Sequence, residues 1–435
     1  MSSLVAITRW TALAAVAVAF AACGDNGGDS PSPKSQKASS ETKPKATPTP
    51  PPSNTAQLTK LLTTRARAIE FGDDDDFLNT SMGAQAKRDK RAMAAAKALP
   101  IDTVQLSADA TEIEGNRATL RVNMSYSFEG IETSYYKTSR MTAEKTPEGW
   151  RISNDRPSAG TLAPWEFTRY KARDSKHFLA LAPRNVRVGK LMTDLEKGRT
   201  TMRRGLPGVK PPHKVLVIVA RNGRDINALT KDLKTRRSLV AVAESQYATT
   251  GSAERITRVW GERVFVMWKS YRAGSTADRR QVVAHELVHS ALAHRTSART
   301  PPWLYEGIAL YASGDNRSGD AGALISGRGV LRNSAEQARA KSAMSLAKLS
   351  RPRALEQMSS VGISFAYAYS SSTAYLIAQK HGRKALLRLL TAYNSEKNKG
   401  SGRKLADRVV RRTLKKSLKT LESEVDSYAS SNSKF

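Results

Sequence analysis

The stretch VVAHELVHSAL, residues 282–292, places charged and polar side chains in an otherwise apolar segment. His285 and His289 stand four residues apart, and Glu286 follows the first histidine. In a helix, residues at this spacing are neighbours on one face, about 5–6 Å apart. Two imidazoles so placed can bind one zinc ion, and the adjacent glutamate can reach a water on that ion. The stretch therefore predicts a zinc-binding helix in which Glu286 is a general base.

The sequence also indicates where this helix begins and that it is buried. Ser275 and Asp278 have the spacing of a capping box, in which each side chain bonds the other residue's backbone N–H. Apolar residues surround the histidines on most sides, which predicts that the helix is buried. A buried helix rarely carries an unpaired glutamate. A catalytic zinc site needs a third protein ligand, so the pattern requires a partner elsewhere in the chain.

Glu306 is the candidate for that third ligand. It lies in PPWLYEGIALYASG, residues 301–314, which predicts a helix that begins at the two prolines and ends near Gly314. Together, HELVH and WLYEGIA resemble the gluzincin metallopeptidases, specifically the peptidase MA-like domains. The resemblance implies that His285, His289 and Glu306 bind Zn2+ and that Glu286 is the catalytic base.

The resemblance extends over residues 163–428 and implies a zincin-like α+β domain. Such a domain has a small sheet, the active-site helix and a helical C-terminal lobe. The rival metzincin pattern HExxHxxGxxH fails, because Leu292 and Arg295 stand where its glycine and third histidine belong. His294 is one residue out of that frame, and we interpret it as an exposed histidine at the helix end.

A tyrosine of the helical lobe is expected to stabilise the oxyanion, as in similar enzymes. The segment FAYAYSSSTAYLIAQKHG, residues 365–382, resembles the Tyr-x-x-Ser helix of that family. Tyr369 is the candidate, with Tyr367 and Tyr375 as alternates. Tyrosines at helical spacing also serve as packing residues, which is the alternative for all three.

Strands and helices are expected before the motif helix. Residues 164–183 predict two short strands, residues 188–206 a helix, KVLVIVA a buried strand, and residues 226–245 a helix. The strand ERVFVMWKS, residues 262–270, directly precedes the motif helix. RVFVMW within it is either an edge strand that pairs with an extended substrate or an interior strand.

Residues 57–158 predict a separate, smaller α+β unit. Two helical segments are followed by strands with clear alternation, as in ATLRVNMSYSF, and by turns of the Glu-Gly type. Helices followed by a meandering antiparallel sheet resemble the NTF2-like family. The run Asp73–Asp76 lacks the alternation and the glycine of a calcium loop and is interpreted as a turn and helix start.

The N-terminus predicts export. A short apolar run, too short to span a bilayer, ends in Ala-Ala-Cys at Cys23, which is the sole cysteine. This resembles a bacterial lipoprotein signal, which implies a lipidated Cys23, cleavage after residue 22 and an extracytoplasmic, membrane-anchored protein. The alternative is an ordinary signal peptide. Residues 24–56 are rich in Pro, Ser, Thr and Lys and predict a disordered linker.

The formal charge of +32, from 71 basic and 39 acidic residues, favours anionic partners such as a cell-wall polymer. No nucleic-acid motif is present, and basic and aromatic residues do not interleave. The expected protein is an exported, membrane-anchored zinc metallopeptidase that acts on a peptide or protein. The alternatives are a zinc-binding but inactive cell-surface scaffold and a wall-binding protein.

Overall fold

The computed structural model describes residues 52–230, 240–250, 255–297, 299–325, 345–351, 354–396 and 402–432. The signal segment with Cys23, and the linker up to residue 51, lie outside these ranges. The linker ends slightly earlier than predicted, because helix α1 begins at Asn54 rather than at Gln57. Ser53 caps it: the Ala56 N–H donates to Ser53 Oγ at 3.2 Å, which satisfies an otherwise free helix-end donor.

The first unit has three helices packed on a four-stranded antiparallel sheet of order β1-β2-β3-β4. Asp73 accepts a hydrogen bond from the Asp76 N–H at 2.9 Å, so the acidic run is a helix cap and first turn, as interpreted above. The elements are α1 (Asn54–Phe71), α2 (Asp74–Asn79), α3 (Gly83–Ala96), β1 (Ile101–Glu114), β2 (Arg117–Phe128), β3 (Tyr135–Thr146) and β4 (Gly149–Pro157).

The second unit is built on a five-stranded mixed sheet of order β5-β6-β7-β9-β8. Its three central strands are parallel, and β5 and β8 are antiparallel edges. The strands are β5 (Tyr170–Asp174), β6 (Phe178–Pro183), β7 (Val215–Ala220), β8 (Ala241–Thr250) and β9 (Arg255–Met267).

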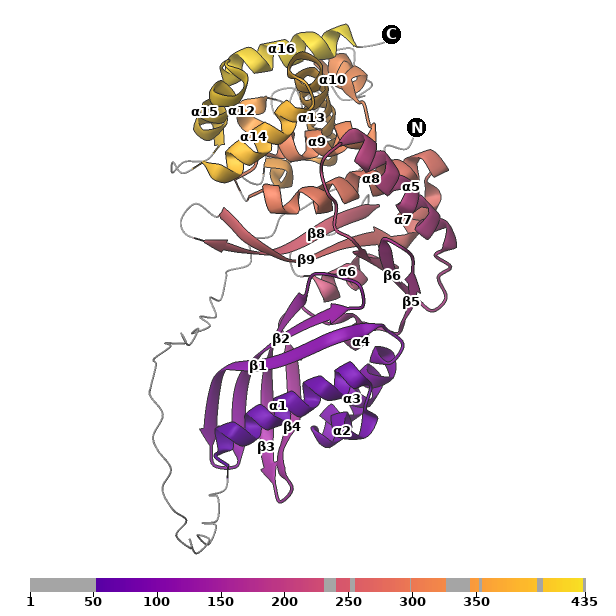
Figure 1. Cartoon of the computed structure of the whole chain (residues 1–435), viewed down its shortest axis with the longest axis vertical. Coiled ribbons are helices and arrows are strands. Elements are labelled where there is room, and N and C mark those ends of the chain that lie inside the picture. Colours follow the sequence, from indigo (N-terminus) through magenta and orange to yellow (C-terminus); the bar gives the residue numbers. More distant parts are fainter. Residues whose placement is uncertain are drawn as a thin grey trace, which may run out of the picture.

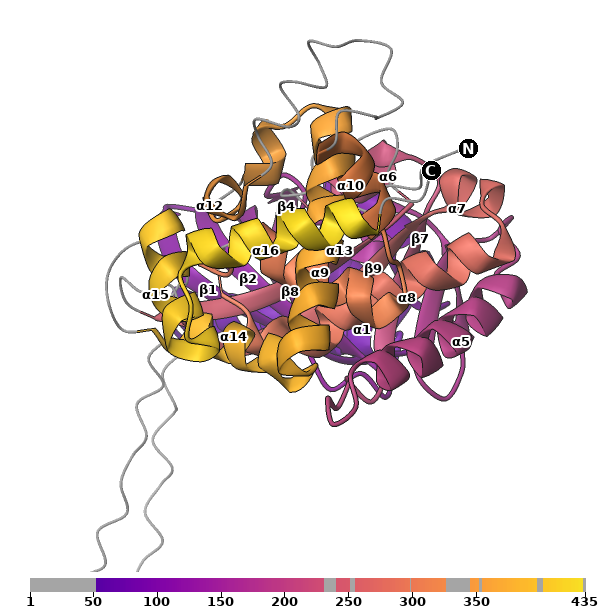
Figure 2. The same cartoon turned by 90° about the horizontal axis from the view of Figure 1, so that it is seen from above.

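Most helices of this unit lie on one side of the sheet and form a lobe beyond it (Figures 1 and 2). Near the sheet are α4 (Pro164–Phe167), α5 (Gly189–Gly205), α6 (Gly223–Leu229), α7 (Trp268–Ala273), α8 (Thr276–Leu292) and the short 3-10 helix η1 (Ala293–Arg295). The lobe contains α9 (Pro302–Ser313), α10 (Ser318–Ile325), α12 (Leu346–Leu349), the 3-10 helix η2 (Ala354–Gln357), α13 (Ser360–His381), α14 (Lys384–Ser395), α15 (Gly402–Leu414) and α16 (Leu418–Ser431). The molecule is therefore α+β, as predicted.

The second sheet is buried on both faces. On β7, Val215, Val217 and Val219 belong to the core under α5, α8 and α9. The alternate residues Leu216 and Ile218 belong to a core that also contains side chains of the first unit. Figure 1 shows this order of layers, with the first unit below the sheet and the helical lobe above it. The two expected units therefore share one hydrophobic core.

One prediction about a strand is corrected, and one open alternative is decided. Residues 241–245, expected at the end of a helix, begin the edge strand β8 instead, whereas residues 226–229 at the start of that predicted helix lie in α6. Ala241 and Ala243 face the helical core and Val242 faces the opposite core, so residues 240–243 are all apolar and the alternation of a strand is hidden there. Of the two alternatives for RVFVMW, the structure has the interior one: residues 263–267 lie in β9, between β7 and β8, and Trp268 begins α7.

Among the described residues, no helix is both long enough and apolar enough to cross a lipid bilayer.

Candidate metal centre

Helix α8 is held at its N-terminus by local and long-range contacts. The Asp278 N–H donates to Ser275 Oγ at 3.2 Å and the Ser275 N–H donates to Asp278 Oδ2 at 3.1 Å, which confirms the predicted capping box. Arg279 and Arg280 each donate to the buried Asp194 of α5, at 2.9 and 3.0 Å. These bonds fix the direction in which the motif helix leaves its cap.

Two glycines let neighbouring helices approach the site closely. A Cβ on Gly198 of α5 would lie 2.8 Å from Val283 Cγ1 on α8. A Cβ on Gly307 of α9 would lie 2.5 Å from the Ser370 carbonyl oxygen on α13. Such distances exclude any larger residue unless the helices move apart. Glycine at these two positions therefore lets α5 pack closely against α8, and α9 closely against α13.

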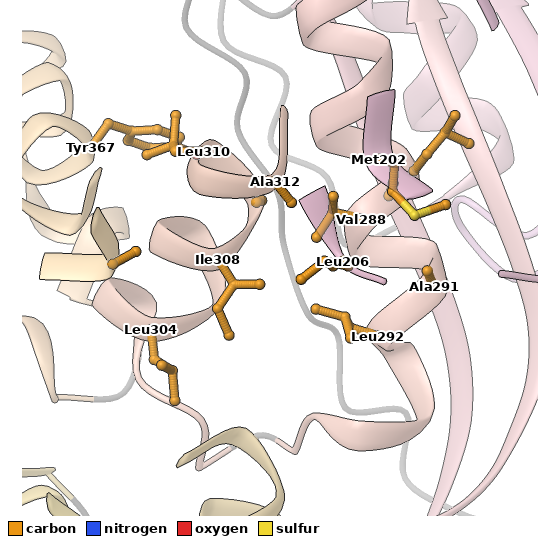
Figure 3. Packing of buried hydrophobic residues seen from close by; sticks show 14 of the residues in the cluster. Met202, Leu206, Val288, Ala291, Leu292, Leu304, Ile308, Leu310, Ala312 and Tyr367 are labelled. Carbon is orange, nitrogen blue, oxygen red and sulfur yellow. The ribbon is translucent and has the colours of Figure 1, made fainter. Parts of the chain in front are cut away.

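Apolar side chains fill the space between α5, α8 and α9, as Figure 3 shows. Deep burial lowers the local dielectric and excludes water from the nearby polar groups. The residues labelled there are Met202, Leu206, Val288, Ala291, Leu292, Leu304, Ile308, Leu310, Ala312 and Tyr367.

Three potential ligand atoms converge in this apolar setting. His285 Nε2 lies 3.1 Å from His289 Nε2 and 3.1 Å from Glu306 Oε2, and His289 Nε2 lies 3.6 Å from the same oxygen. All three residues are buried, and they form a group that could hold a metal ion. Ligands about 2.1 Å from a tetrahedral zinc ion lie about 3.4 Å from one another, within this range of distances.

The charges of the cluster also fit a cation. Burial raises the pKa of Glu306, but contacts with His285 and His289 outweigh this and lower it to about 2. Burial lowers the pKa of His285, and the contact with Glu306 together with the charge of Glu286 more than offsets this, so that the pKa is raised. Glu306 Oε1 is buried and has no hydrogen-bond partner among the described residues. An ionised carboxylate beside two imidazoles is a suitable donor set for zinc.

Glu286 lies between this cluster and the edge strand β8. Its Oε2 accepts a hydrogen bond from the Ala243 N–H at 2.7 Å. Its Oε1 is buried and unpartnered within the described part of the chain. Burial, outweighing the two histidines, raises the pKa of Glu286. A carboxylate with one oxygen held and the other free, and with a raised pKa, suits a general base.

The structure places a different tyrosine at the cluster from the one predicted. The ring of Tyr367 stacks on His285 with centroids 6.1 Å apart, whereas the Tyr369 hydroxyl donates to Asp426 of α16 at 2.9 Å. Two residues apart on a helix, the side chains differ by about 200° in direction, so they cannot face one site together. The third candidate, Tyr375, packs its ring against Tyr311.

Tyr367 and Tyr305 are the aromatic residues in contact with the two histidines. Burial and the charge of Glu306 raise the pKa of Tyr367 well above its ordinary value, so its hydroxyl stays protonated. The Tyr305 ring meets His289 edge-on at 5.8 Å. The contact of Tyr305 with His289 was not predicted from the sequence. Its position directly before the candidate ligand Glu306 could have indicated that it lies near the cluster. Ala243 could not be predicted, because it contributes only its backbone.

The remaining histidines do not join the cluster. His294 is exposed in η1, as interpreted from the sequence. His177 Nδ1 contacts Glu196 Oε2 at 2.8 Å, and Ser175 donates to the other oxygen of that carboxylate. This pair is half-exposed, and both oxygens of Glu196 have partners. The pair is a surface contact whose carboxylate oxygens both have partners, and we do not interpret it as a second metal site.

Comparison with known proteins adds little to this geometry. No family model matches the chain, and no curated protein matches it at a significant level. Among solved structures, Rv3472(D26N), a protein of unknown function from Mycobacterium tuberculosis, is 14% identical with a TM-score of 0.20, over 25% of this chain and 76% of that one. An NTF2-like superfamily protein from Salmonella enterica is also 14% identical with a TM-score of 0.20, over 24% of this chain and 89% of that one.

Proposed function

We propose that this protein is a zinc metallopeptidase of the gluzincin type, with a zincin-like second unit. The convergence of His285, His289 and Glu306 on one buried point, with Glu286 beside it, carries the proposal. A bound zinc ion would polarise a peptide carbonyl and make a water molecule acidic enough to attack it near neutral pH. The three ligand residues would hold that ion.

Glu286 has the geometry of the proton carrier. The Ala243 N–H holds Oε2, which leaves Oε1 to take a proton from the attacking water. The raised pKa of this carboxyl brings it nearer to neutrality, where a base can both accept a proton and return it to the leaving amine. The same bond shows that the outer edge of β8 faces the base, so an extended peptide added to this edge would pass close to Glu286.

Tyr367 is the candidate for stabilising the oxyanion, in place of Tyr369. Its hydroxyl is buried, has no hydrogen-bond partner among the described residues, and stays protonated. A protonated donor in a site of low dielectric stabilises negative charge more strongly than it would in water. The stacked contact with His285 holds the ring in place.

The proposal is tested by measuring bound zinc and peptide hydrolysis in the wild type and in His289→Ala. The full chain and His289→Ala are purified, supplied with zinc, dialysed and assayed for bound metal, and then incubated with a diverse peptide mixture whose cleavage is followed by mass spectrometry. We expect about one zinc per wild-type chain and new peptide ends, both lost in His289→Ala. A folded wild type that binds no zinc would exclude the proposal. Zinc without cleavage would favour the inactive scaffold.

The proposed location rests on the sequence alone. A lipidated Cys23 would anchor the protein outside the cytoplasm and place the site near cell-surface proteins. Cys23→Ala should then release the protein from the membrane fraction, and mass spectrometry of the wild-type N-terminus should show an acylated cysteine. Wall-polymer binding is a further proposal from the positive charge.

A further inference from the structure

The helical lobe carries a pocket that shares no residue with the metal cluster. It has a volume of about 390 Å³ and is lined by residues of η1, α14 and α15. Each of these elements contributes one arginine: Arg295, Arg388 and Arg412. Three guanidinium groups that approach one hollow from three elements repel one another unless an anion lies between them.

Few acidic groups neutralise these arginines. Arg412 Nη1 pairs with Glu396 Oε2 at 3.0 Å. Arg295 Nε donates to the neighbouring His294 at 3.2 Å, which leaves its charge uncompensated. Arg388 is exposed and makes no ion pair or hydrogen bond within the described residues. Three positive charges less the one of Glu396 leave a formal charge of about +2 at the pocket.

The remaining lining supplies hydrogen-bond donors and a short apolar wall. Thr391 and Ser395 follow Arg388 at three and seven residues along α14, so all three lie on one side of that helix. Leu387 and Ala392 also line the pocket and offer apolar contact to whatever is attached to the anion. Arginine forks and hydroxyl groups are the donors that proteins use for phosphate oxygens.

Arg408 provides an independent observation beside the pocket. It lies one turn before Arg412 on the same face of α15. Its Nε and Nη2 atoms are buried without a hydrogen-bond partner among the described residues. A buried guanidinium without an acceptor is costly in free energy. Its uncompensated charge adds to the positive potential around the pocket.

We propose that the pocket formed by Arg295, Arg388 and Arg412 binds the phosphate group of a phosphomonoester. At pH 7 such a group carries a charge of about −1.5 to −2, which matches the pocket, whereas a carboxylate carries only one charge. The tetrahedral anion can also accept from all three arginines at once. Leu387 and Ala392 contact the organic part of the ligand. This site does not depend on the metal centre.

The test measures binding of glycerol 3-phosphate by calorimetry to the full chain, Arg388→Glu and Arg403→Glu. Arg403 is an exposed arginine of α15 outside the pocket, so both variants change the total charge equally. At about 0.15 M salt, charges beyond about 8 Å are screened. We expect one site, affinity about tenfold or more weaker in Arg388→Glu, and less than twofold weaker in Arg403→Glu.

Two further ligands test whether the pocket prefers phosphate to carboxylate and whether the phosphate belongs to a lipid or to a soluble ester. Acetate should bind at least about tenfold more weakly than glycerol 3-phosphate, because it lacks the second charge. Vesicles of phosphatidylcholine with phosphatidic acid, compared with phosphatidylcholine alone, test for a lipid headgroup. Arg388-dependent binding to these vesicles assigns the site to a membrane lipid, and Arg388-dependent binding of only the soluble ester assigns it to a free ligand. No binding of either, equal losses in both variants, or acetate binding as tightly would overturn the proposal.

Discussion

The two faces of the second sheet each bury a charged group, and the two groups differ in how completely their atoms are paired. On the face toward the first unit, Arg263 Nε pairs with Glu244 Oε2 at 2.6 Å and Nη2 donates to the Leu229 carbonyl at 2.8 Å. Thr230 donates to the other oxygen of Glu244 at 2.8 Å. Each carboxylate oxygen there has a partner inside the protein.

On the helical face, two carboxylates at the metal cluster have oxygens without hydrogen-bond partners. Glu286 and Glu306 are as deeply buried as Glu244, yet each has one oxygen without a partner among the described residues. Native proteins rarely leave buried polar atoms unpaired without a reason. The Arg263–Glu244 pair is therefore a completed structural contact, whereas the His285–His289–Glu306 cluster keeps an unpartnered oxygen and could hold a metal ion.

The largest expected effect comes from Glu286→Gln. Glutamine keeps the shape and can still accept from Ala243, but it cannot take a proton, so peptide hydrolysis should fall by about 10²–10⁴-fold. Zinc content should stay at the wild-type value, because Glu286 is not a ligand in the proposed site. Cleavage assays and metal analysis on the same preparation check both. Wild-type activity in a zinc-loaded variant would remove Glu286 from the proposed mechanism.

Arg263→Ala tests the other face. Removing one partner of a buried pair leaves Glu244 uncompensated, so the free energy of unfolding should fall by about 3–5 kcal/mol. Urea unfolding of the variant measures this. The control replaces both partners, as Arg263→Met with Glu244→Leu, and should be markedly less destabilised. If Arg263→Ala is as stable as the wild type, the Arg263–Glu244 pair is not the structural contact described above.

Tyr367→Phe and Tyr369→Phe form a matched pair of hydroxyl deletions on one helix. Tyr367→Phe should lower kcat by about 10²–10³-fold if its hydroxyl stabilises the oxyanion. Tyr369→Phe should leave kcat unchanged and cost about 1.5–3 kcal/mol of stability, because it loses the bond to Asp426. Steady-state kinetics and urea unfolding of both variants distinguish these roles. The reverse pattern would restore Tyr369 as the catalytic tyrosine.

Metal removal should have a modest effect on stability. An ion that binds only the folded state at 100 times its Kd stabilises that state by about 2.7 kcal/mol, and a chelator removes this gain. The Tm of the zinc-loaded wild type should therefore fall on chelation, while that of His289→Ala should not change. Calorimetric scans with and without chelator measure the difference. Equal responses of the two proteins would place the metal elsewhere.

The local parts of the site could be predicted from the amino-acid sequence. The four-residue spacing of His285 and His289 needs only a helix to bring them together, and Ser275 with Asp278 shows where that helix begins. Glu306 was readable from its motif, and the structure brings it to the two histidines. The α+β character of both units followed from the periodicity of their apolar residues.

Only the tertiary structure decided what depends on packing between elements. Residues 240–243 are all apolar because the start of β8 is buried on both faces, so the alternation typical of a strand is absent from this part of the sequence. The choice of Tyr367 over Tyr369 depends on how α13 is rotated against α9, which Gly307 sets by allowing close approach. The shared core of the two units has the same origin, because which faces meet is decided by contacts between distant parts of the chain and not by local propensity.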